Sequence, residues 1–354
     1  MNTMITTAKK LFIVFALIFV SGCEESPNLG PAPGPNPTQN ADWLIPESLV
    51  FDGGPGKDGI PSIDDPQFSP VPDITFLADD DLVVLVEVNG DVRGYPHPVL
   101  DWHEIVNDSP GLLPLSVSYC PLTGTALGWE RKIDGEETTF GVSGLLYNTN
   151  LMPYDRKTNS TWSQIRQDCV NGELISTKAN QYPVTEIEWG LLKATMPDIM
   201  ILNTDTGFSR NYGRYPYGDY KTNHDRLLFP VTEEDNSLPQ KERVLGVIDG
   251  QSVKVYQYAL FPGNGGMVED TFKGKSVIIA GHESQNYIVI FEKPEGISLS
   301  FLENEFPNIL VDDSGNKYNI FGASETTQQL KYSDSFIGFY FSFPAFFEEV
   351  DIYE

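Results

Sequence analysis

The apolar residues of this chain occur mainly in short runs that are separated by Gly, Asn and Asp. From about Trp43 onward these runs are rich in β-branched and aromatic residues, a pattern typical of strands joined by turns. The clearest case is a predicted hairpin, in which runs at 82–88 and 91–95 flank Asn89-Gly90. Asn-Gly is the strongest two-residue turn signal, because both positions tolerate positive φ.

Further strands are predicted at 115–119 and 125–131, and helical patterns are few. One helix is predicted at 98–107 and another at 186–195. The sequence therefore predicts a mainly β fold, of α+β class only through a few short helices.

Part of this pattern repeats along the chain. With Asp108 placed over Asp270, several segments correspond in the same order, at an offset of 162 that drifts to 156 downstream. The corresponding pairs are 82–95 with 244–256, 115–117 with 277–279, 129–131 with 291–293, 158–162 with 314–318, and 188–202 with 338–353. We therefore predict two related β-rich lobes that arose by internal duplication.

The two copies are expected to be unequal. The first lobe is predicted at 43–205 and a degenerate second lobe at 241–354, with a Tyr/Gly-rich connector at 206–240. Cys120 of the first lobe corresponds to His282 of the second, and Trp102-His103 has no counterpart. The candidate site is therefore placed in the first lobe.

The N-terminus has the features of an export signal. Lys9 and Lys10 precede an apolar run at 11–20, too short to span a membrane. The run leads to a small-residue segment ending at Cys23, which resembles a lipoprotein lipobox. We expect residues 1–22 to be a signal peptide, Cys23 to be lipidated, and the Pro-rich residues 23–42 to be an extended tether. The expected location is the cell envelope outside the cytoplasm, on an outer membrane or cell surface.

The formal net charge of −27 excludes some partners. Loss of residues 1–22 would remove two lysines and no acid, giving −29. A protein with this net negative charge repels the phosphate backbones of nucleic acids, and no nucleic-acid partner is expected. Besides Cys23 the chain has Cys120 and Cys169, which could form one bridge but no disulfide scaffold.

The most distinctive residues lie at 95–108, followed by Tyr119 to Thr125. Supporting segments occur at 57–61, 140–148, 154–156 and 160–164, with a Pro-Tyr element at 216–217. In these motifs, over about residues 50–350, the chain resembles bacterial domain-of-unknown-function family 3179. The resemblance implies a fold unit and no mechanism. Many members resemble Cys-Pro-Leu-Cys where this chain has Thr123 last, which argues against a redox dithiol here.

Cys120 is the first candidate for chemistry, since it ends a predicted strand and enters a Pro/Gly turn. A thiol becomes a nucleophile only as a thiolate, which needs a nearby positive or hydrogen-bonding group. His103 is the candidate base, and Asp155 or Glu104 could orient it in a triad-like arrangement. A buried structural cysteine is the alternative.

A metal site is a second possibility. Cys120 with His103 or His97 would offer soft ligands that favour copper or zinc. His103-Glu104 begins a zinc-protease motif, but Asn107 stands where the second histidine is required.

A ligand pocket is a third possibility, because polar groups lie beside large rings in the same motifs. Such mixtures suit the binding of a small polar molecule and equally suit a buried structural network. The candidate ligand-binding residues are Tyr95, Trp102, Arg156, Trp162 and Gln164.

Three hypotheses remain open at this point. The first is binding of a small polar ligand or metal around Cys120 and His103. The second is a thiol-dependent enzyme with Cys120 as nucleophile or redox centre. The third is a cell-envelope scaffold for partner contacts, which exposed apolar patches would favour.

Overall fold

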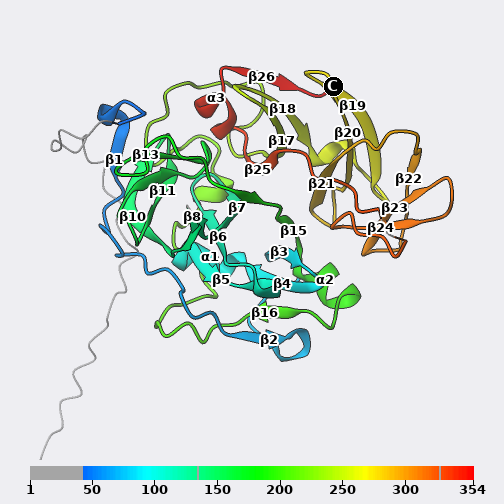
Figure 1. Cartoon of the computed structure of the whole chain (residues 1–354), viewed down its shortest axis with the longest axis horizontal. Helices are drawn as coiled ribbons and strands as arrows, with labels where there is room; N and C mark the ends of the chain where they lie inside the picture. Colours follow the sequence, from blue (N-terminus) through cyan, green and yellow to red (C-terminus); the bar gives the residue numbers. More distant parts are fainter. Residues whose placement is uncertain (1–42, 134, 327) are drawn as a thin grey trace, which may run out of the picture.

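The computed structural model describes residues 43–133, 135–326 and 328–354, and the fold is mainly β. The predicted signal peptide, Cys23 and the tether lie outside these residues. Figure 1 shows the first lobe in blue to green and the second in yellow to red, with the sheets arranged around a common centre. We call residues 43–205 the first lobe, 206–240 the connector and 241–354 the second lobe.

The first lobe contains three larger sheets, one short ribbon and two α-helices. One sheet has the order β15 (Thr185–Glu188), β3 (Leu82–Val88), β4 (Asp91–Pro96), β16 (Met200–Leu202) and β2 (Phe68–Pro70). The next has the order β14 (Gln181–Tyr182), β7 (Thr125–Glu130), β6 (Leu115–Cys120) and β5 (Ile105–Asp108). The third has the order β1 (Val50–Asp52), β10 (Phe140–Tyr147), β11 (Asn150–Asp155), β12 (Thr161–Ser163) and β13 (Asp168–Asn171), and the ribbon pairs β8 (Lys132–Ile133) with β9 (Glu136–Glu137). The helices are α1 (His97–His103) and α2 (Trp189–Thr195).

The second lobe contains three sheets and one helix. The first sheet has the order β25 (Ser335–Phe339), β17 (Arg243–Asp249), β18 (Ser252–Gln257) and β26 (Glu349–Ile352). The second sheet has the order β19 (Gly266–Phe272), β20 (Lys275–His282) and β21 (Tyr287–Glu292). The third sheet has the order β22 (Leu299–Phe301), β23 (Asn308–Asp312) and β24 (Lys317–Asn319). The helix α3 (Ser342–Phe346) precedes β26. Short 3-10 turns complete the described elements at Glu47–Leu49, Val71–Asp73, Pro110–Leu112, Tyr220–Thr222 and Tyr258–Leu260.

The predicted hairpin at 82–95 is confirmed. Strands β3 and β4 pair in antiparallel register, and both turn residues have positive φ, 52° at Asn89 and 85° at Gly90. Positive φ at both positions is the geometry of a type I′ turn, which fits the twist of the strands.

Both predicted helices are wrong at one end. The first was expected to reach residue 107, but α1 ends at His103 and Ile105–Asp108 form β5, which pairs with β6. The second was expected from residue 186, but Thr185–Glu188 pair with β3 as β15, so that α2 starts at Trp189. In both cases strand pairing overrides a local helical pattern: β5 pairs with the next strand in the chain, and β15 pairs with a strand much earlier in the sequence.

The two lobes share one pattern of strand pairing. In each, a central hairpin (β3–β4 or β17–β18) pairs antiparallel through its first strand with β15 or β25. Its second strand pairs parallel with β16 or β26. The internal duplication remains a prediction, and this shared pairing is what a duplication would leave.

One polar contact occurs at the same place in each lobe. The Tyr95 hydroxyl donates to Asp108 Oδ2 at 2.7 Å, and the Tyr256 hydroxyl donates to Asp270 Oδ2 at 2.8 Å. A basic side chain pairs with each carboxylate, Arg93 with Asp108 and Lys254 with Asp270.

This matched pair of contacts gives a prediction about stability. Tyr95→Phe is expected to lower the free energy of unfolding by about 1–3 kcal/mol, because it leaves a buried carboxylate oxygen without its donor. Tyr256→Phe should cost less, since the Asp270 side chain is 17% exposed against 7% for Asp108, and water can replace the lost donor. Denaturant midpoints of the two variants test this, and an equal or larger loss at Tyr256 would contradict it.

The lobes also share a core. Strand β25 contacts β7, and β15 contacts β21, so each lobe lies against the other through equivalent strands. Phe339, Phe341 and Phe343 of the second lobe pack in the same cluster as Trp129 and Trp162 of the first. The first lobe therefore depends on the second to complete its apolar interior.

Candidate functional site

A cavity of about 790 Å³ lies in the first lobe beneath the connector. Helix α1 and its C-terminal end supply Asp101, Trp102 and Glu104, and the connector supplies exposed Arg210 and Arg214 at the rim. The apolar wall consists of Ile60, Leu122, Val142, Leu145, Leu146, Leu151 and Phe229. This volume lies within the range of small-molecule sites, about 300–1,000 Å³.

The two carboxyl groups of the cavity come from the C-terminal end of one short helix. Asp101 lies in the last turn of α1, and Glu104 directly follows the helix as its C-cap residue. Glu104 has a positive φ of 57°, and its backbone N–H donates to the carbonyl of Leu100 to end α1. A left-handed backbone is unfavourable for a residue with a side chain, so glutamate is an unusual choice here.

Asp101 is buried without a partner for one of its oxygens. Its side-chain Oδ1 makes no hydrogen bond to any described residue. Burial raises the pKa of Asp101 to about 8; Lys221 acts in the opposite sense, while Asp81 and Glu104 add to the increase. Asp101 is therefore largely protonated at neutral pH.

Glu104 has one hydrogen-bonding partner in the same cavity. The Tyr217 hydroxyl donates to Glu104 Oε1 at 3.3 Å. Burial raises the pKa of Glu104 to about 7, although the bond from Tyr217 acts to lower it. The cavity thus contains two carboxyl groups that change charge near neutral pH, and such groups are typical of functional sites.

Cys120 lies behind this cavity and does not line it. The side chain is 2% exposed, and Sγ lies 3.8 Å from the Thr149 carbonyl oxygen. Burial raises the pKa of the Cys120 thiol, and the nearby charge of Glu104 raises it further. A nucleophilic thiolate requires the opposite shift.

His103 is held by two hydrogen bonds to other groups. Nδ1 lies 2.7 Å from the Pro61 carbonyl oxygen and Nε2 lies 2.8 Å from the Tyr212 hydroxyl. Because a carbonyl oxygen can only accept, Nδ1–H donates to Pro61 and the Tyr212 hydroxyl donates to Nε2. Burial lowers the pKa of His103, which favours this neutral form. His103 therefore fixes the connector through Tyr212, and neither ring nitrogen is directed at Cys120.

Three other predicted site residues form buried networks. Asp155 accepts hydrogen bonds from the Trp162 indole at 3.1 Å and from Thr158. Gln164 donates to Ser118 and to the Thr125 carbonyl. Asp155, Trp162 and Gln164 are each at most 1% exposed and do not line the cavity.

Arg156 and Trp102 lie nearer the surface. Arg156 pairs with Asp58 at 3.0 Å and with Asp64 at 3.2 Å, and so fastens the segment before β2 to the third sheet. Trp102 lines the cavity, and its indole donates to the Arg214 carbonyl at 3.1 Å. Of the predicted ligand-binding residues, Trp102 is the one that lines this cavity, whereas Tyr95 is bound to Asp108.

His97 does not line the cavity, and it belongs to a charged network. Its Nε2 is 2.9 Å from Glu186, which also pairs with Arg243 at 2.9 Å. Among the residues that the structure describes, no group of three or more His, Cys, Asp or Glu is placed to hold a metal ion. Cys120 and Cys169 are both free and buried.

The environment of Cys120 predicts slow alkylation. We expect iodoacetamide to modify Cys120 in the native Cys169→Ser variant at least about 100-fold more slowly than a model thiol at pH 7.5, because the thiol is protonated and inaccessible. Mass spectrometry against time measures the rate, and unfolding in denaturant should restore ordinary reactivity. A native rate equal to that of the model thiol would contradict the structure around Sγ.

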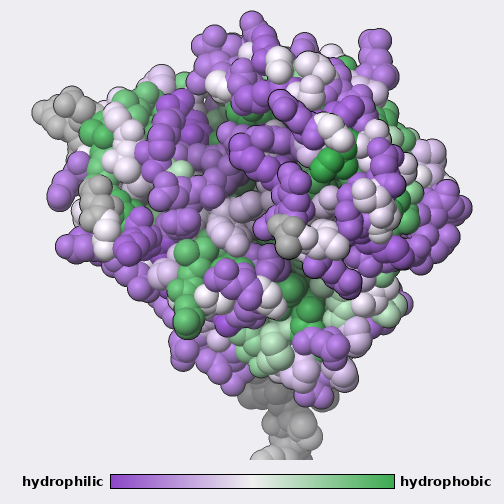
Figure 2. All heavy atoms as spheres, turned by 45° about the vertical axis from the view of Figure 1, so that its right-hand side comes forward, coloured by the Kyte–Doolittle hydropathy of each residue, from purple (hydrophilic) through white to green (hydrophobic). Residues whose placement is uncertain are grey.

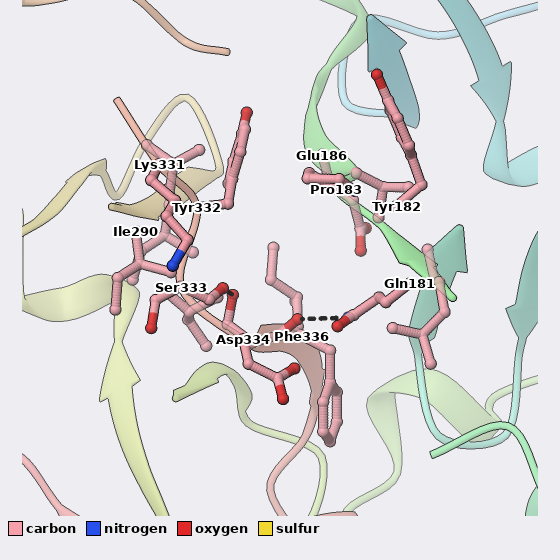
Figure 3. Close-up of a pocket in the computed structure, with 18 of the residues that line it drawn as sticks. Gln181, Tyr182, Pro183, Glu186, Ile290, Lys331, Tyr332, Ser333, Asp334 and Phe336 are labelled. Atoms are coloured by element: carbon pink, nitrogen blue, oxygen red, sulfur yellow. Dashed lines mark hydrogen bonds between the residues drawn. The ribbon is translucent and has the colours of Figure 1, made fainter. Parts of the chain in front are cut away.

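A second cavity, of about 320 Å³, lies between the lobes. Figure 3 shows Gln181, Tyr182 and Glu186 facing Lys331 and Asp334 across it, with Gln181 donating to the Ser335 carbonyl. Its charged lining is largely paired, Glu186 with Arg243, Lys331 with Glu292, and Lys275 with Asp249. Paired charges need no ligand for neutralisation, and the cavity beneath the connector is the stronger candidate.

The comparisons with known proteins agree with the motifs. The family described as protein of unknown function (DUF3179) matches residues 57–350. The chain belongs to the DUF3179 family. That match includes α1, the cavity wall and the connector, so the candidate site is part of the DUF3179 unit. No curated protein and no solved structure matches the chain.

The surface outside the two cavities offers fewer indications of an interaction site. In the view of Figure 2, hydrophilic residues cover most of the surface and apolar residues form separate small patches. The exposed large apolar side chains come from different segments: Leu44, Leu112, Met200 and Phe208. None of the helices in the described part of the chain has the length and apolar character needed to cross a membrane.

Proposed function

We propose that this protein is a lipid-anchored, extracytoplasmic binding protein that holds a small organic molecule in the cavity beneath the connector. The observation that carries the proposal is a cavity of about 790 Å³ whose mostly apolar lining includes two carboxyl residues, Asp101 and Glu104, without basic partners among the described residues. Carboxyl groups that converge on an apolar cavity can orient the polar part of a bound molecule.

The shape and lining of the cavity favour binding over thiol chemistry. The ligand's apolar part would lie against β10 and β11, through Val142, Leu145 and Leu151. Its polar part would face Asp101 and Glu104. The proposed centre is therefore the pair Asp101 and Glu104 at the C-terminal end of α1, in place of Cys120 and His103.

A cavity-filling variant tests this function. We expect 1-octanol to bind the purified folded body, with heat measured by titration calorimetry, because its alkyl chain fits against an aliphatic wall. Leu145→Trp should abolish the heat, since the larger ring occupies the cavity. Leu112→Trp is the matched control, because Leu112 is 93% exposed and does not line the cavity.

The outcomes separate clearly. Loss of binding in Leu145→Trp with retention in Leu112→Trp supports the site. Absence of binding in the unmodified protein, or equal binding by both variants, overturns it.

The anchoring part of the proposal has its own test. The lipobox pattern at Cys23 supports it, and removal of the signal would leave that cysteine at the new N-terminus. Bacteria that express the full chain should incorporate labelled palmitate into it, and Cys23→Ser should abolish the label. Label retained in Cys23→Ser would exclude acylation at this residue.

A further inference from the structure

The floor of the cavity contains acidic groups without basic partners. No ion pair within 4 Å joins Asp101 or Glu104 to a basic side chain of the described residues. Asp101 is 7% exposed and Glu104 is also 7% exposed, so water reaches them poorly. Buried carboxyl groups in proteins are ordinarily paired, hydrogen-bonded or protonated.

Aromatic rings line the same floor. Trp102 and Tyr217 both border the cavity, and the rings of Tyr215 and Tyr217 lie 5.5 Å apart. The faces of indole and phenol rings attract cations, more strongly where water is excluded. Carboxyl groups beside such rings form an environment suited to an organic cation.

From these two features we propose that the ligand bears an ammonium group on an apolar body. The ammonium would lie between the Asp101 and Glu104 carboxylates, against Trp102 and Tyr217, and the apolar body would lie along β10 and β11. The inference rests on the proposed function and adds the ligand's chemical class.

The charges around the cavity are compatible with this ligand. Lys221, which acts on Asp101, lies over the Tyr215 ring at 5.0 Å and is exposed. Arg210 and Arg214 at the rim are also exposed, and salt screens exposed charges over about 8 Å under physiological conditions. The overall charge of −27 favours the approach of cations.

Proton release provides a signature of this binding mode. Burial holds both carboxyl groups partly protonated near neutral pH, and an ammonium favours their ionised forms. Binding at pH 7 is therefore expected to release protons. Calorimetry in two buffers with different ionisation enthalpies measures the number released.

The experiment compares three probes that share one alkyl chain: n-octylammonium, 1-octanol and octanoate. We expect n-octylammonium to bind at least about tenfold more tightly than 1-octanol at pH 7, and octanoate to bind most weakly. The Asp101→Asn, Glu104→Gln double variant should lose this preference and retain 1-octanol binding. The matched control is Asp198→Asn, an exposed aspartate away from the cavity lining.

Different failures have different meanings. Equal binding of n-octylammonium and 1-octanol, or tightest binding of octanoate at the rim arginines, overturns the ammonium proposal and leaves the cavity as a binding site. Binding of n-octylammonium unchanged in the double variant also overturns it. Absence of binding by all three probes overturns the proposed function itself.

Discussion

Asp101→Asn is expected to stabilise the ligand-free protein at pH 9 by on the order of 5 kcal/mol, although it removes a charged group. In the folded protein the pKa of Asp101 is raised from 3.8 to about 8. Each unit of pKa difference corresponds to about 1.4 kcal/mol. The folded state therefore binds the Asp101 proton more tightly than the unfolded state does.

The sign of the pH dependence follows directly. Stability falls with increasing pH wherever the folded state holds more protons, which for Asp101 is between about pH 4 and pH 8. Asparagine cannot ionise, so the variant should lack this loss. At pH 4 both proteins contain a neutral side chain at position 101 and should differ by less than about 1 kcal/mol.

Urea unfolding at pH 4, 7 and 9 measures this effect, with Asp198→Asn as an exposed control. The difference between the Asp101 variant and the unmodified protein should increase steadily with pH, and the control should remain flat. A difference independent of pH would mean that Asp101 ionises normally. An aspartate whose ionisation destabilises the folded protein is expected at a position that selection retains for ligand binding.

Arg243→Met is expected to lower the free energy of unfolding by about 3–5 kcal/mol, because it leaves a buried carboxylate without its partner. Arg243 in the second lobe pairs with Glu186 in the first, whose side chain is 2% exposed. Burial alone would raise the pKa of Glu186, but Arg243 and His97 hold it below its usual value. The carboxylate is therefore charged at neutral pH.

The stabilisation from this pair is present above the unfolded pKa of Glu186 and is lost as pH falls through its lower folded value. Adding Glu186→Leu to the Arg243→Met variant should recover much of the loss, since no buried charge then remains. The control is Arg226→Met, whose pair with Asp219 is exposed to solvent and should contribute little to stability. Equal losses at Arg226 and Arg243, measured by denaturant unfolding, would contradict a buried bridge between the lobes.

The sequence predicted the parts of the fold that depend on neighbouring residues. The hairpin at 82–95 was predictable because alternation and the Asn-Gly turn act within a few residues. The end of α1 was not, because residues 105–108 continue the helical pattern of apolar positions and yet pair with the next strand, β6. The start of α2 was not predictable either, because β15 pairs with β3 some hundred residues earlier, a contact that no local pattern encodes.

The candidate site was predicted in its region but not in its residues. The segment from Tyr95 to Asp108 contains the two carboxyl groups of the cavity, whereas the residue types alone favoured Cys120 and His103, whose side chains are the more reactive. Burial decides which groups are perturbed, and burial depends on the tertiary structure. The three-residue spacing of Asp101 and Glu104, and the Tyr/Arg content of the connector, were the available signals.

The core shared by the two lobes has a consequence for folding during translation. A ribosome makes residues 43–205 before it makes Phe339, Phe341 and Phe343, which those residues need for their interior. Nascent chains that lack the last few dozen amino acids should therefore expose unfilled hydrophobic surface and be substrates for chaperones and proteases. The cavity is therefore expected to form only when translation is nearly complete. A chain truncated near its C-terminus should lack the cavity as completely as a chain truncated within α1.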